Sequence, residues 1–93
     1  MSIRDALTLR DWKGTLADGT PVVLRRPSAL DLLEALEVNA KTPERLGAWM
    51  VARHLVEDGV PVFASVDEAL AADAFMVQRI AQLVEPLYAE GRD

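Results

Sequence analysis

Two apolar runs near the N-terminus have the pattern of β-strands. We expect strands at residues 9–16 and 21–26, joined by a turn with Asp18-Gly19 at its centre, because Asp-Gly between apolar runs is a strong hairpin signal. Trp12 is the expected anchor of the first strand. Since a two-stranded hairpin is marginal alone, it should pack on the helices or pair with a partner, and both arrangements stay open.

A helix is expected from Ser28 onward. Ser28 is a good N-cap, and Asp31 three positions later favours the helix N-terminus. Apolar residues at helical spacing predict one buried stripe, formed by Ala29, Leu32, Leu33, Leu36 and Ala40. Leu30 and Val38 lie on or beside the opposite, charged side, where they are either scattered surface residues or a strip that contacts a partner.

A second helix is expected from Thr42-Pro43 to about Glu57, with Gly59 just beyond its end. Its apolar residues surround nearly the whole circumference, which indicates a helix that is central in the fold or covered by another chain. They are Leu46, Ala48, Trp49, Met50, Val51, Ala52, Leu55 and Val56. His54 is expected on the surface of this helix without a chemical role.

A short extended run at residues 60–63 follows. Pro61 limits any strand pairing there to a sheet edge, and Phe63 is expected in the core. Ser65 and Glu68 form a capping box that predicts a short helix at 66–71. The stretch 58–68 thus ends one helix and starts the next.

The last helix is expected to begin after Asp73 and to reach about Glu85 or Tyr88, and Pro86 should end or kink it. Its broad apolar arc comprises Met76, Val77, Ile80, Leu83, Val84, Leu87 and Tyr88. Residues 90–93 are expected to be a frayed tail.

These elements predict a single domain over residues 1–93 of the α+β class, mostly α. An N-terminal two-stranded β-hairpin (8–27) would precede a compact bundle of three to four helices (28–89). The chain has no cysteine, so disulfides and thiolate chemistry are excluded. Neither a secretory signal nor an apolar run of about 20 residues is present. We therefore expect a soluble, cytoplasmic protein with no membrane partner.

Charge is distributed unevenly. The net charge is −5, with +2 in residues 1–26 and −7 in residues 27–93. The acidic helical part would repel phosphate backbones, so no nucleic-acid partner is expected.

Candidate catalytic and ligand-binding residues are sparse. There is one histidine, His54, without the nucleophile or further ligands that catalysis or metal binding requires. The carboxylates lie at helix first turns and on solvated faces, without calcium-loop spacing, and the glycines are isolated, so no phosphate-binding loop is present. The sequence predicts a protein that is not an enzyme, with no cofactor and no metal.

Two segments carry a family resemblance, residues 18–33 (DGTPVVLRRPSALDLL) and residues 58–70 (DGVPVFASVDEAL). With the terminal amphipathic helix, their order and spacing resemble the small tail assembly chaperones of long-tailed bacteriophages and prophages, over roughly residues 8–88. The resemblance implies a protein that binds the long, helical, aggregation-prone tape measure protein in the host cytoplasm. It implies further that the chaperone helps to recruit tail tube subunits and leaves before the tail is complete.

Several points stay open within this reading. Many relatives have a longer frameshifted product, and a protein sequence does not show whether one exists here. The client-binding surface and the oligomeric state, including homo-oligomerisation, are undecided. Candidate contact residues are the apolar ones on the three helices: Leu30, Val38, Trp49, Met50, Val51, Met76, Ile80, Leu83 and Leu87. For each, the competing interpretation is the protein's own core.

Two other functions compete with the chaperone. The first is a small dimeric regulatory or antitoxin-like interaction module, which would pair through its last helix. The second is a small enzyme subunit, which would need a ligand pocket.

Overall fold

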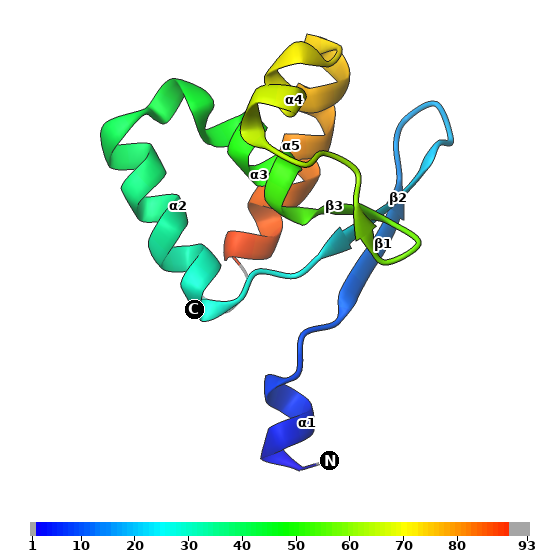
Figure 1. The fold of residues 1–93 in the computed structure, drawn as a ribbon. Helices are drawn as coiled ribbons and strands as arrows, with labels where there is room; N and C mark the ends of the chain where they lie inside the picture. The colour runs from blue at the N-terminus through cyan, green and yellow to red at the C-terminus, as the bar shows by residue number, and fades with distance from the viewer. Residues whose placement is uncertain (1, 90–93) are drawn as a thin grey trace.

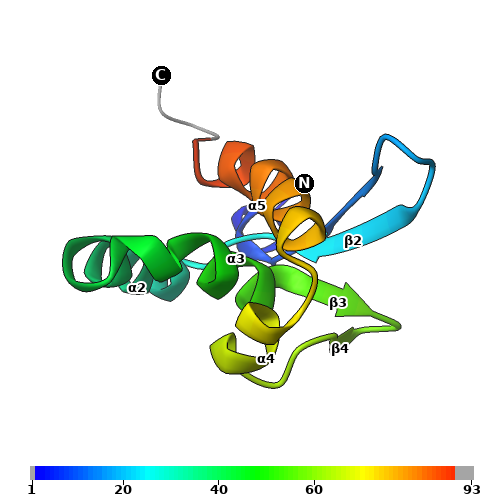
Figure 2. The ribbon, with the colours of Figure 1, turned by 90° about the horizontal axis from the view of Figure 1, so that it is seen from above.

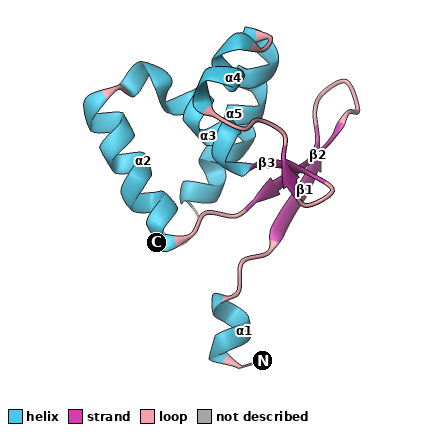
Figure 3. Cartoon of the chain, viewed as in Figure 1, coloured by secondary structure: helices cyan, strands magenta, loops and turns pink. Residues whose placement is uncertain are grey.

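The computed structural model of the chain describes residues 2–89 (Figures 1 and 3). The expected frayed tail at 90–93 lies outside the described residues. The elements in chain order are α1 (Ile3–Leu7), β1 (Asp11–Thr15), β2 (Pro21–Arg25), α2 (Ala29–Lys41), the 3₁₀ turn η1 (Pro43–Arg45), α3 (Leu46–His54), β3 (Leu55–Glu57), β4 (Val60–Pro61), α4 (Val66–Ala71) and α5 (Ala74–Ala89).

The sheet is larger than expected. It has four antiparallel strands in the order β1-β2-β3-β4, so the prediction of a two-stranded hairpin followed by a helical bundle is wrong. The expected second helix ends at His54, and the chain continues into a second hairpin, β3–β4. Asp58 and Gly59 form its two-residue loop with φ of 53° and 78°, the positive values that tight hairpin loops require. Leu55 and Val56 fit the helical period, which hid the strand.

The first hairpin pairs β1 with β2 and places Trp12 opposite Leu24. Its turn contains Gly19 at φ 90°, and the Asp18 side chain accepts a 2.9 Å hydrogen bond from the Thr20 amide. Trp12 packs against the core and lies over Gly14, where an added Cβ would come within 2.2 Å of the indole ring. The hairpin therefore packs on its own chain, with Trp12 as the expected anchor.

Helix α3 is the centre of the core, as its apolar circumference predicts. It packs against α4 and α5, while β2 and β3 cover the sheet side of the same core. Leu24, Val51 and Val84 come from three different elements and are fully buried. In both ribbon views α3 lies between the sheet and α2, which occupies the far side of the molecule (Figures 1 and 2).

The last two helices begin at the expected caps. The Ser65 hydroxyl accepts from the Glu68 amide at 3.3 Å, while the Glu68 carboxylate reaches back to the amide of Ala64 rather than of Ser65. Asp73 accepts from the amides at the start of α5. Pro86 does not end α5, which continues to Ala89.

Helix α1 had no counterpart among the expected elements. It projects beyond the body ahead of β1 and has no buried residue (Figure 1). Across residues 2–89, no helix is both long and apolar enough to cross a membrane.

Candidate functional site

The expected buried stripe of α2 faces solvent. We call its five residues, Ala29, Leu32, Leu33, Leu36 and Ala40, the α2 stripe. Leu33 and Leu36 are each 66% exposed and Leu32 is 43% exposed, and both alanines are exposed. The prediction that this stripe packs into the core is therefore wrong, although its residues do share one side of the helix.

The opposite side of α2 faces the body and is partly polar. Asp31 and Ala35 are its buried residues, and Glu34 and Val38 are half-buried beside them. At 100° per residue, Asp31, Ala35 and Val38 lie about half a turn from Leu33 and Leu36. The helix thus rests on the side that carries Asp31 and Glu34.

Arg53 of α3 holds this polar side in place. One Arg53 nitrogen lies 3.4 Å from Asp31 Oδ1, and the other donates to the Glu34 carboxylate. The guanidinium also lies over the Trp49 ring, 5.2 Å from its centroid. Buried carboxylates are tolerated only when they are paired, so this arginine is the reason that Asp31 can be buried.

Asp31 has a second role at the start of α2. Its Oδ2 accepts from the Ser28 amide at 2.9 Å, and the Ser28 hydroxyl accepts from the Asp31 amide at 3.1 Å. This is a complete capping box with aspartate in the acidic position. The cap and the Arg53 pair together turn Asp31 inward, and the neighbouring leucines consequently turn outward.

His54 is also part of the polar interior. It is fully buried, so the expectation of a surface histidine is wrong. Its Nδ1 lies 2.7 Å from the Arg25 carbonyl oxygen. A carbonyl can only accept, so Nδ1 carries the proton and Nε2 accepts from the Tyr88 hydroxyl. These bonds tie the end of α3 to β2 and to the end of α5.

Burial dominates the titration of this pair. Desolvation lowers the pKa of His54 below its usual 6.5, against the opposing effects of the Arg25 hydrogen bond and the Asp31 charge. Desolvation likewise raises the pKa of the Tyr88 phenol, with a smaller contribution from Asp31. Both side chains stay neutral near pH 7. Within residues 2–89, no group of three or more potential metal ligands is found.

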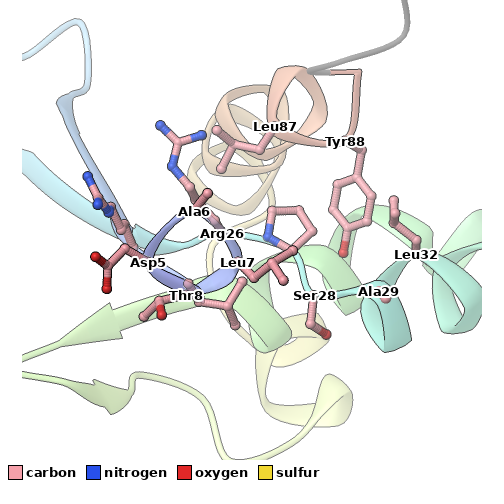
Figure 4. Close-up of a pocket in the computed structure, with 13 residues that line it drawn as sticks. Asp5, Ala6, Leu7, Thr8, Arg26, Ser28, Ala29, Leu32, Leu87 and Tyr88 are labelled. Atoms are coloured by element: carbon pink, nitrogen blue, oxygen red, sulfur yellow. The ribbon is translucent and has the colours of Figure 1, made fainter. Parts of the chain in front are cut away.

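An open hollow of about 780 Å³ adjoins the N-terminal end of the α2 stripe (Figure 4). Its walls come from α1 with the segment after it, from the first turn of α2, and from the end of α5. Leu7, Leu32 and Leu87 supply apolar surface, and Leu7 is 76% exposed. The hollow therefore continues the apolar surface of the α2 stripe toward the N-terminal arm, residues 2–10.

The structure places the residues that we named as candidate partner contacts mainly in the core. Trp49, Met50, Val51, Ile80 and Leu87 are buried. Val38, Met76 and Leu83 are partly buried and pack against the same core. Leu30 is exposed at 58% and lies on α2 beside the stripe. A partner could reach the buried residues only after a rearrangement, whereas it could reach Leu30 directly.

Apart from Leu30, the accessible apolar residues are the ones that sequence reasoning assigned to the core or passed over. The α2 stripe was assigned inward, and Ile3 and Leu7 of α1 were not considered. One signal could have corrected the first error. A helix with four leucines in its first eight residues and a potential capping-box aspartate has two sides that could be buried, and the cap favours the aspartate side.

No family model, no curated protein and no solved structure matches the chain.

Proposed function

We propose that the chain is a non-enzymatic tail assembly chaperone of a long-tailed bacteriophage or prophage. It binds the tape measure protein and keeps it soluble during tail assembly. The observation that supports this proposal best is the outward orientation of the α2 stripe. Apolar residues at positions i, i+3, i+4 and i+7 of an exposed helix are the pattern by which one amphipathic helix docks on another.

The chemistry of the stripe suits a long helical client. Three leucines without polar neighbours between them accept many apolar sequences, because their contacts are not directional. Leu30, 58% exposed at the side of the stripe, widens this surface. The net charge of −5 keeps a protein with such a surface dispersed and disfavours nucleic acid as a partner.

The site of action in this proposal is the host cytoplasm, and the protein is absent from the mature virion. Both statements rest on the family resemblance of residues 18–33 and 58–70. The same resemblance supports the tail tube protein as a second partner. That partner would bind outside the α2 stripe, because the client occupies the stripe.

Co-expression tests the proposal. The chain is produced with the products of its flanking genes, and a pull-down is expected to recover a very long helical protein. The variant Leu33→Lys with Leu36→Lys should lose at least about 90% of the recovered client, because lysine at both positions places charge in the apolar contact. The matched control is Gln78→Lys with Gln82→Lys, which adds the same charge to the exposed side of α5.

Two results would count against the proposal. If no flanking gene encodes a long helical protein and nothing co-purifies, the chaperone function is wrong. If the client is recovered equally with the α2 and α5 variants, the client binds but the stripe is not its site.

A further inference from the structure

The two edge strands of the sheet, β1 and β4, differ in what they offer to a further strand. Strand β4 has two residues, and Pro61 has no N–H to donate. Strand β1 has five residues and packs principally on β2, while α1 lies beyond its end rather than along it (Figure 1). An edge of this kind presents a row of backbone donors and acceptors to which another strand can pair.

The hairpin turn shows which backbone groups of β1 point outward. The Leu16 amide donates to the Thr20 carbonyl at 2.8 Å, so these two residues form a hydrogen-bonded pair. Bonded and non-bonded pairs alternate along an antiparallel ladder, so the next pair, Thr15 with Pro21, is a non-bonded one, as suits a proline. The odd-numbered residues of β1 therefore direct their N–H and C=O groups away from β2. They are Asp11, Lys13 and Thr15.

We infer that β1 pairs antiparallel with β1 of a second copy of this chain, about a two-fold axis at Trp12. This register sets Asp11 against Lys13 of the second copy, and Lys13 against its Asp11, at positions where both strands direct their backbone groups toward each other. Trp12 meets its own counterpart on the axis, and Arg10 faces Gly14. The contact is isologous, and it joins the two sheets into one of eight strands.

Charge selects this register from those that the backbone allows. Because the outward groups fall on alternate residues, the two-fold axis must pass through a residue rather than between two residues. An axis at Arg10, Asp11 or Lys13 would set that residue against its own copy, with like charges opposed. An axis at Gly14 or Thr15 would give neither Asp11 nor Lys13 an opposite charge. The axis at Trp12 forms two ion pairs, and no pair within residues 8–16 opposes like charges.

The two charged side chains are available for these contacts. Asp11 and Lys13 are exposed on the side of the sheet away from the core, and neither makes an ion pair within residues 2–89. Opposed residues of antiparallel strands lie on the same side of the sheet, so the two charges meet there. A single strand edge buries less than the roughly 1,200 Å² of stable complexes, so the dimer is a weak one. It leaves the α2 stripe open and does not depend on the proposed chaperone function.

Sedimentation velocity over a concentration series tests the dimer with the full chain. The wild-type protein should pass from monomer to dimer as its concentration rises from about 1 μM to about 1 mM. Lys13→Glu should weaken the dimer by at least about tenfold, because it sets a second carboxylate opposite Asp11. The matched control is Arg79→Glu, which makes the same change in net charge on the exposed side of α5 and should dimerise like the wild type. A wild-type protein that stays monomeric throughout would overturn the inference.

Mixing two charge variants tests the register. Lys13→Asp opposes carboxylates in its own dimer, and Asp11→Lys opposes ammonium groups, whereas one chain of each restores both ion pairs. The mixture should therefore associate at least about tenfold more tightly than either variant alone. Association in the mixture that is no tighter than in the separate variants would contradict the register.

Hydrogen exchange locates the contact. The amides of Asp11 and Lys13 point away from β2, so their exchange should slow by at least about threefold between dilute protein and protein at about 1 mM, where the dimer forms. The amides of Trp12 and Gly14 are internal controls, because they bond to β2 in both states. A dimer in which the Asp11 and Lys13 amides exchange as in the monomer would be joined through another face and would refute the inference. A monomer whose edge amides are protected only when a client is added would show that the client occupies the edge, which would also refute it.

Discussion

Helices α2 and α5 are both amphipathic, but they present opposite sides to the body. Helix α5 buries Ile80, Ala81, Val84, Leu87 and Tyr88, and it exposes Gln78, Arg79, Gln82 and Glu85. Helix α2 buries Asp31 and Ala35 and exposes its leucines. An apolar side that faces inward stabilises the fold, whereas one that faces outward is available for recognition.

The difference comes from what each helix meets on α3. Helix α5 meets the apolar side of α3. A Cβ added at Gly47 of α3 would lie 3.7 Å from the Cβ of Ala81 on α5, so the two helices pack closely there. Helix α2 meets Arg53, whose guanidinium pairs with the carboxylates of Asp31 and Glu34 and lies over the Trp49 ring. The ion pair therefore orients α2, and the apolar core orients α5.

The largest effect is expected in the core of α5. Leu87→Ala should lower the free energy of unfolding by about 2–5 kcal/mol, because it removes a side chain that is only 7% exposed and leaves a cavity. Urea unfolding followed by circular dichroism measures it. The control is Phe75→Ala in the same helix. Because Phe75 is 72% exposed, this substitution should change the free energy of unfolding by less than about 0.5 kcal/mol.

The next largest effect is expected at the polar contact of α2. Arg53→Met should cost about 2–3 kcal/mol, because it leaves the Asp31 carboxylate buried without its cation. This loss of stability is somewhat smaller than the loss expected for a fully buried ion pair, because the Arg53 side chain is 32% exposed. Arg79→Met on the outer side of α5 is the control and should be nearly neutral. Equal stability of both variants would mean that the ion pair does not orient α2.

A smaller effect is expected from pH, through His54 at the junction of α3, β2 and α5. Because its folded pKa lies below 6.5, the unfolded chain binds the proton more readily. Stability should therefore fall as pH decreases from 6.5 toward the folded pKa, with a slope of at most about 1.4 kcal/mol per pH unit. The free energy of unfolding between pH 7.5 and 5 measures it.

The control for the pH effect is His54→Gln, which is less stable throughout but should lack this slope. A wild-type stability that is flat across the interval would contradict the buried, neutral histidine. The raised pKa of Tyr88 acts at the other extreme, because the unfolded phenol ionises first, so stability should also decline above about pH 10.

The smallest effect on the monomer is expected for Leu36→Ala, the same substitution as at Leu87. Because Leu36 is 66% exposed, the free energy of unfolding should change by less than about 0.5 kcal/mol in dilute protein. A decrease of more than about 2 kcal/mol in the free energy of unfolding of the monomer would mean that Leu36 lies in the core. It would contradict the difference in orientation between α2 and α5.

Local signals in the sequence predict much of the chain correctly. The Asp18-Gly19 turn, the caps at Ser28, Ser65 and Asp73, and the apolar circumference of α3 all correspond to what the structure contains. These features depend on neighbours within four residues or on one helix alone. Such local preferences are readable without knowledge of the tertiary fold.

The failures involve partners that are distant in the chain. The strand β3 depends on pairing of Val56 with Val23, 33 positions away, and its residues fit a helix equally well. The orientation of α2 depends on Arg53, 22 positions after Asp31. The role of His54 depends on Arg25 and Tyr88. Periodicity shows which residues share a side of a helix, but not which side a distant partner will bury.

Thiol accessibility tests the orientation of α2 most directly, because the wild-type chain has no cysteine. Leu36→Cys and Ala35→Cys are labelled with a maleimide in dilute protein without denaturant, and each rate is compared with that of the unfolded variant. The thiol at position 36 should react nearly as fast as in the unfolded chain, and the thiol at 35 at least about tenfold more slowly, since Ala35 is buried. The reverse order would show that the leucines face the core, and it would contradict the account of α2 as an exposed recognition helix.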